Sequence, residues 1–125
     1  MDADLNHAAA LLASARKSGR LHELTGQLGK DFLRAGLPPF PATGDREGEP
    51  TDADLARLLQ ERLYRLLMEN FDGYLNLMYA VDVPQRIFRE LRITDAVEVA
   101  RQMTAVVIAR EWQKVQLRAG LEPDH

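Results

Sequence analysis

The chain has 125 residues, of which 46% are hydrophobic and 28% are charged, and its formal net charge is −3. This length allows one self-sufficient core, and the absence of cysteine excludes disulfides, thiolate zinc sites, iron–sulfur clusters and cysteine nucleophiles. The acidic balance argues against nucleic acid as a partner, because duplex binding depends on neutralising phosphates.

The N-terminal sequence does not have the pattern of a secretory signal. Residues 1–5 are acidic where such a signal is basic, and the apolar stretch that follows is short and interrupted by Arg16 and Lys17. No other stretch approaches the roughly 20 apolar residues of a membrane span. We therefore expect a cytoplasmic protein that does not enter a membrane.

Residues 1–35 are predicted to form an N-terminal helical arm. Its apolar positions make two stripes, which lie about 160° apart if one continuous helix is drawn through both. The phase must therefore break near Ser18 and Gly19, either between two short helices or at a kink, and Ser18 could be an N-cap. The stripes consist of Leu5, Ala8, Ala9 and Leu12, and of Leu21, Leu24, Leu28 and Phe32.

Residues 36–50 contain four prolines and three glycines, which predicts a loop or linker. This segment could tether a loose, partner-binding arm, or it could let the arm dock on the rest of the chain. We favour the docked arm, because Leu24, Leu28 and Phe32 would otherwise be exposed to water. Limited proteolysis is then expected to cut first at residues 45–47 and to leave the two fragments associated.

Residues 51–118 are predicted to form the helical core, which begins with a long helix over residues 52–81. Thr51 is a suitable N-cap, with a carboxylate three residues later at Asp54. One face of the helix is apolar from Leu55 to Val81. Asn70 and Gly73 interrupt that face; Asn70 could fix the register of a helix pair, and Gly73 could admit another backbone.

Two more helices complete the predicted core. Asp82 and Pro84 suit the start of a short helix over residues 84–91, and Thr94 and Asp95 cap a closing helix over residues 95–118. Residues 119–125 form a tail. No segment alternates like a strand, so we expect an all-α, single-domain helical bundle with two long helices, a short connecting helix and the N-terminal arm.

Both long helices carry apolar side chains on the face opposite the predicted core stripe. Exposed apolar patches usually mark interfaces, which predicts a homodimer or another protein partner. Alternatively, the N-terminal arm covers these faces. The candidate interface residues are Tyr64, Met68, Leu75, Tyr79, Val99, Val106 and Trp112.

Glu111 is the most unusual carboxylate, because it projects from the apolar face of the closing helix. It could lie in solvent beyond the end of the core, or it could be paired at the mouth of a cleft with Arg62 or Arg86. A small-molecule pocket between the long helices would combine polar tips with apolar walls. Its candidate residues are Asn70, Tyr74, Tyr79, Glu111 and Trp112.

The sequence at residues 75–83, together with the stretch at residues 107–114, resembles small bacterial proteins of uncharacterised function. The shared feature is an aromatic-x-hydrophobic-Asp-Val turn after a long helix, here from Tyr79 to Val83. The resemblance covers about the last 70 residues and excludes the arm and the proline-rich linker. It implies an all-helical fold in a bacterial cytoplasm and no activity.

The sequence has no phosphate-binding loop, no His-Glu-x-x-His motif and no nucleophile next to a base. We therefore expect no catalytic residue, no metal ion and no cofactor. The leading hypothesis is a non-enzymatic interaction or oligomerisation protein. The alternative is a small-molecule binder or a modest acid–base enzyme that uses the pocket between the long helices.

Overall fold

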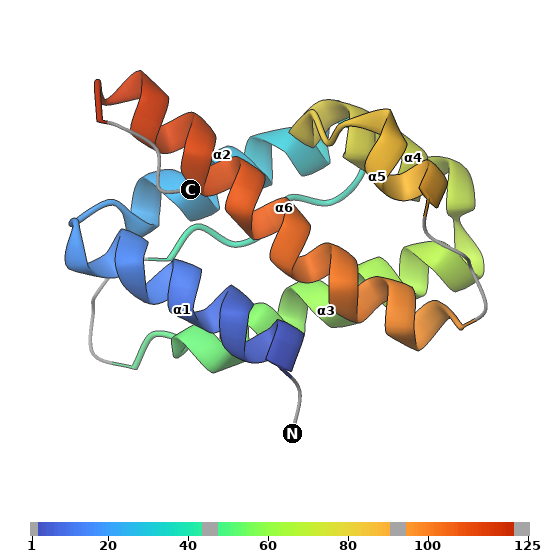
Figure 1. Ribbon diagram of the computed structural model, residues 1–125, viewed down its shortest axis with the longest axis horizontal. Helices are drawn as coiled ribbons and strands as arrows, with labels where there is room; N and C mark the ends of the chain where they lie inside the picture. Colours follow the sequence, from blue (N-terminus) through green and yellow to red (C-terminus); the bar gives the residue numbers. More distant parts are fainter. Residues whose placement is uncertain (1–2, 44–47, 91–94, 122–125) are drawn as a thin grey trace.

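A computed structural model describes residues 3–43, 48–90 and 95–121, without the side chains of residue 3 and residues 88–90. The described part of the chain is all-α, as the sequence predicts, and forms a helical bundle (Figure 1). None of its helices is long and apolar enough to span a membrane. The helices are α1 (Ala3–Lys17), α2 (Leu21–Arg34), α3 (Asp52–Glu69), α4 (Phe71–Val81), α5 (Gln85–Glu90) and α6 (Ala96–Arg118).

The predicted break in the N-terminal arm is confirmed, and it lies between α1 and α2. Gly19 has a φ of +70°, a conformation that glycine adopts without strain. The expected N-cap at Ser18 is wrong, because Arg20 occupies that position without a capping side chain. The Ser18 hydroxyl instead donates a hydrogen bond to the carbonyl of Ser14, at 3.0 Å.

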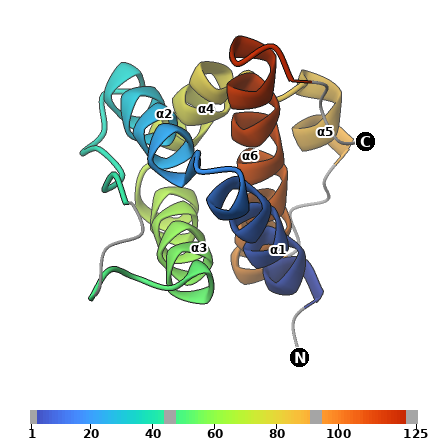
Figure 2. The same ribbon diagram turned by 90° about the vertical axis from the view of Figure 1, so that its left-hand side faces the viewer.

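The arm is docked on the rest of the chain. Helix α1 packs against α3 and α6, and α2 packs against α4 and α6 (Figure 2). The apolar stripes of both arm helices are buried because they meet these partners, so the arm supplies part of the common core. The fully or almost fully buried arm residues include Ala8, Leu12, Ala15, Leu24, Leu28 and Phe32.

The proline-rich segment is held against α2 and α3. The Phe40 ring stacks on Phe32 with centroids 6.0 Å apart, and the Thr43 amide donates to the Thr25 hydroxyl oxygen at 2.8 Å. The Arg62 guanidinium lies over both phenylalanine rings and donates to the carbonyls of Pro38 and Pro39. The expected cleavage site at residues 45–47 lies outside the described residues.

Two glycines of α2 should respond in opposite ways to alanine. A Cβ at Gly29 would lie 2.8 Å from the Phe40 carbonyl oxygen, whereas a Cβ at Gly26 would meet nothing within 4 Å. Gly29→Ala should therefore lower the free energy of unfolding by roughly 1–3 kcal/mol, because backbone must shift. Gly26→Ala should raise it by about 0.5–1 kcal/mol. Urea denaturation measures both; equal effects would contradict the close approach.

The expected continuous helix over residues 52–81 is wrong at Asn70. This residue leaves the helical conformation, with φ −152° and ψ 72°, ends α3 and caps α4. Its side-chain oxygen accepts a hydrogen bond from the Gly73 amide at 3.0 Å. A Cβ at Gly73 would lie 2.6 Å from the Asn70 amide nitrogen. The glycine therefore makes room for the cap, and no register-fixing role for Asn70 is needed.

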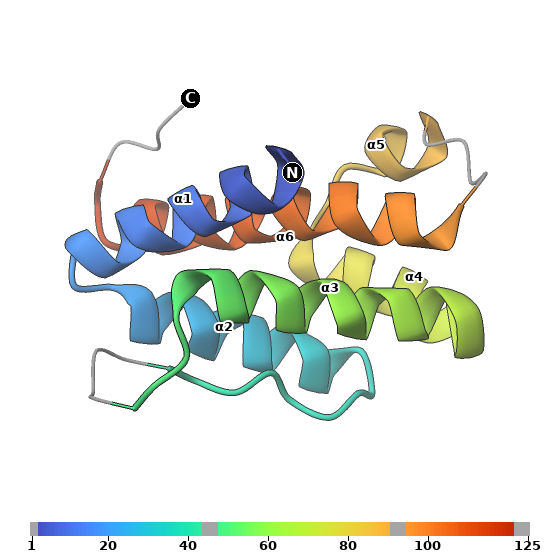
Figure 3. The same ribbon diagram turned by 90° about the horizontal axis from the view of Figure 1, so that it is seen from below.

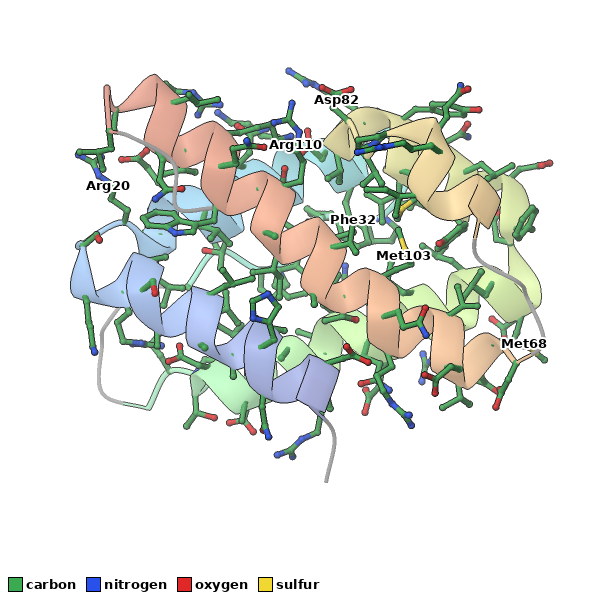
Figure 4. All side chains as sticks on the ribbon, in the orientation of Figure 1. Arg20, Phe32, Met68, Asp82, Met103 and Arg110 are labelled. Atoms are coloured by element: carbon green, nitrogen blue, oxygen red, sulfur yellow. The ribbon has the colours of Figure 1, made fainter. Side chains whose placement is uncertain are left out.

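The turn after α4 is held by contacts with α6. Asp82 ends α4 with a φ of +71°, and the Val83 amide donates to the Met78 carbonyl at 3.0 Å. Arg110 of α6 holds this turn, because it donates to the Asp82 carboxylate at 2.7 Å and to its carbonyl at 3.2 Å (Figure 4). Asp82 adopts the left-handed conformation of a helix C-cap, which residues with a short polar side chain reach at lower cost than most others.

Helix α6 is the central element of the bundle and begins where the sequence predicts. The Asp95 side chain accepts a hydrogen bond from the Val97 amide at 2.9 Å. The helix packs against α1, α2, α3 and α4, so it is buried on more than one face. Met103 points into this interior (Figure 4). On the face of α6 opposite the predicted core stripe, Val99 is buried and Val106 is half-buried, whereas Leu117 is 56% exposed.

Candidate functional site

Three ionisable side chains meet where α2 and α6 lie side by side. Asp31 comes from α2, and Glu111 and Lys114 come from α6; we call them the α2–α6 charge cluster. The Lys114 Nζ lies 2.7 Å from an Asp31 carboxylate oxygen and 2.5 Å from Glu111 Oε1. Both acids have side chains that are 0% exposed, and the lysine side chain is 17% exposed. A partly buried cation therefore bridges two buried acids.

Polar side chains surround the cluster on its outer side. Gln27 donates from its amide to Asp31 at 3.2 Å, and Arg118 donates to the Gln27 carbonyl oxygen at 2.6 Å. Arg34 lies 3.6 Å from Asp31 across one turn of α2. These contacts connect α2 to the last turns of α6, so the cluster is part of a network that joins the arm to the closing helix.

The environment of Glu111 favours its neutral form. Burial, and then the nearby Asp31 carboxyl group, raise the pKa of Glu111 from 4.5 to about 8, although Lys114 opposes the shift. The charge of Asp31 adds to the shift, because a like charge nearby disfavours ionisation. At neutral pH the raised pKa therefore favours the uncharged form of Glu111.

The structure shows Glu111 paired, as one of the two sequence interpretations expects, but with different partners and in the buried interior. This side chain is not solvated, and its contacts are Lys114 and Asp31 rather than Arg62 or Arg86. Sequence reasoning did not find Asp31, which is 83 residues away from Lys114. One signal was present: Asp31 follows Leu24 and Leu28 on the apolar stripe of its helix, where a charge requires a partner.

The chemistry open to this cluster is limited by its burial. A general acid or base must come within hydrogen-bonding reach of a substrate proton. Three hollows on the described part of the surface are lined by other residues, and none of their walls contains Asp31, Glu111 or Lys114. The cluster is therefore suited to holding α2 against α6.

The five residues of the expected pocket do not line one hollow. Asn70 lies in a hollow between α3 and the proline-rich segment, whose walls contain none of the other four. Tyr79 is exposed, and Trp112 is buried in the core. Tyr74 is also buried, and loss of solvent raises the pKa of its hydroxyl to about 12.

The seven expected interface residues fall into three groups. Val99 and Trp112 are only 3% exposed, so assigning them to an open interface is wrong; helices packed around α6 cover them. Leu75 and Val106 are half-buried against the core. Three remain exposed: Tyr64, Met68 and Tyr79.

The exposed apolar side chains gather around the end of α3. Tyr64, Met68 and Phe71 follow one another at intervals of four and three residues, and Val97 shares a hollow of about 440 Å³ with Tyr64. Met68 is 61% exposed and projects outward (Figure 4). We call Tyr64, Met68, Phe71 and Val97 the apolar patch. Phe71 and Val97 were not among the expected interface residues.

The described residues contain no group of three or more acidic or histidine side chains placed to hold a metal ion. Comparison with known proteins found no matching family model, no matching curated protein and no matching solved structure.

Proposed function

We propose that this chain is a non-enzymatic interaction protein that forms a homodimer through the apolar patch. The observation that carries the proposal is the exposure of Tyr64 and Val97 beside one hollow, with the exposed Met68 one turn further along α3. Aromatic residues and methionine are enriched at the centres of protein interfaces, and exposed apolar clusters are uncommon on monomers.

The coverage of α6 supports this choice of surface. The sequence has apolar side chains on the outer faces of both long segments, and the helices packed around α6 bury Val99 and Trp112 of the second segment. Nothing in the described part of the chain covers the outer face of α3, which lies at the front of the molecule in Figure 3. The apolar patch is therefore a surface available to a second copy.

The location of the protein in a cell is part of the same proposal. The resemblance of residues 75–83 and 107–114 to small bacterial helical proteins supports a bacterial cytoplasm. The alternative function, a small-molecule or acid–base site, gains no support from the described hollows, because their walls do not contain the buried acids.

Met68→Glu is expected to weaken self-association at least about tenfold, because a charge would be buried at the contact. Leu33→Glu is the matched control, since Leu33 is 58% exposed but lies on α2, away from the apolar patch. Light scattering coupled to gel filtration measures the association of each variant. Thermal denaturation should show both variants folded, because exposed substitutions change stability little.

Equal effects of the two substitutions would place the contact elsewhere. A Met68→Glu variant that associates as tightly as the unaltered chain would show that the apolar patch is not the interface.

A further inference from the structure

Four charged side chains form a row along the outer face of α3. They are Arg57, Glu61, Arg65 and Glu69, which alternate in sign at intervals of four residues, or about 6 Å along the helix. We call them the α3 charge row. All four are exposed, and the row runs beside Tyr64 and Met68 of the apolar patch.

Alternating charges at this spacing often pair within their own helix. Here they do not: among the described residues, none of the four lies in an ion pair or accepts or donates a side-chain hydrogen bond. Arg57 interacts electrostatically with Asp54 of its own helix, but the exposed charges of the row can still meet charges on another molecule.

The order of the charges selects one way for two copies of α3 to meet. Suppose that the two helices run antiparallel and that the two-fold axis crosses them at the height of residue 63. Glu61 then faces Arg65 of the partner subunit, and Arg57 faces Glu69 of the partner subunit. Parallel helices would place each charge beside its own copy. An antiparallel pair whose axis is shifted to residue 61 or 65 would also bring like charges together, which opposes those arrangements.

The surface beside the row has a ridge and hollows of the kind that helix packing requires. Arg65 and Glu69 stand between two hollows, one of about 440 Å³ that includes Val97 and one of about 420 Å³ that includes Phe32 and Leu66. A ridge with a hollow on each side can interlock with the same ridge of a second copy, since residues four apart form the ridges of the commonest helix packing. A two-fold contact uses one self-complementary surface twice.

We infer that the second copy binds with its α3 antiparallel to the first, about a two-fold axis at residue 63, so that the two α3 charge rows pair along their length. This inference rests on the proposed homodimer and adds its geometry.

The test is a charge reversal followed by a second reversal in the same chain. Glu61→Arg should weaken the dimer about tenfold, because it creates two like-charge contacts across the axis. Adding Arg65→Glu should restore the dissociation constant to within about threefold of the original, because opposite charges face each other again. Sedimentation equilibrium of the full chain measures each constant, and circular dichroism confirms folding.

If the α3 charge row only stabilised its own helix, the expected result would be different. Inside one chain, the single and the double variant each leave two like-charge neighbours and one opposite-charge neighbour along the row, so stabilisation of the helix alone gives no rescue. A dimer weakened by Glu61→Arg but not rescued by Arg65→Glu would overturn the antiparallel pairing.

The remaining outcomes separate this inference from the proposed function. A dimer that responds to Met68→Glu but not to Glu61→Arg would keep the apolar patch as the interface and overturn the charge pairing. An unaltered chain that stays monomeric would overturn both.

Discussion

The free energy of unfolding is expected to fall as the pH rises from about 4.5 to about 8, by on the order of 4 kcal/mol in total. In this range the unfolded chain releases the Glu111 proton while the folded chain retains it. Because the folded state then binds more protons, each rise in pH favours unfolding. The stabilisation that proton binding to Glu111 gives the folded state is fully present below pH 4.5 and is lost as the pH rises through about 8.

Glu111→Gln supplies the control for this pH dependence. The amide has nearly the same shape, can donate to Asp31 and does not ionise. The variant should lose the slope between pH 5 and 8, and at pH 8 it should be more stable than the unaltered chain. Urea denaturation at fixed protein concentration across this range measures the slope, since dimerisation also contributes to stability. A slope that persists in Glu111→Gln would assign it to another group.

Lys114→Met is expected to lower the free energy of unfolding by about 3–5 kcal/mol at pH 7, because the buried Asp31 carboxylate loses its cation. The double variant Lys114→Met, Asp31→Asn should recover most of this loss, since no ionised group of that pair remains. The expected coupling energy in the double-mutant cycle is about 2 kcal/mol or more. Chemical denaturation of the four proteins measures it.

An exposed ion pair provides the comparison. Arg20 and Glu23 lie 2.8 Å apart, but both are substantially exposed. Arg20→Met should therefore cost less than about 1 kcal/mol. Similar losses for Lys114→Met and Arg20→Met would show that the α2–α6 charge cluster is not desolvated in solution.

The helix starts could be predicted because their causes are local. Thr51 and Asp54 form a reciprocal capping box, with hydrogen bonds of 3.1 and 3.2 Å, and Asp95 caps α6. The break at Asn70 is also local, but only one residue leaves the helix, so the apolar periodicity continues through it. Periodicity alone therefore favoured one long helix, although the Asn-x-x-Gly spacing is the feature that permits the new cap.

The candidate site could not be predicted because it depends on tertiary packing. Glu111 is recognisable as a charge on an apolar face, but its partner Asp31 is brought to it by the docking of α2. The helices packed around α6 bury Val99 and Trp112, whereas Tyr64 and Met68 of α3 stay exposed. Periodicity identifies which faces are apolar, whereas only the arrangement of helices decides which of them remain uncovered.

Sedimentation equilibrium of the unaltered chain tests the central claim most directly. The chain mass is 14.1 kDa. A homodimer predicts an average mass that rises with concentration through the micromolar range and levels off at twice this value. A mass that stays at one chain up to the highest measurable concentration would contradict the proposed function.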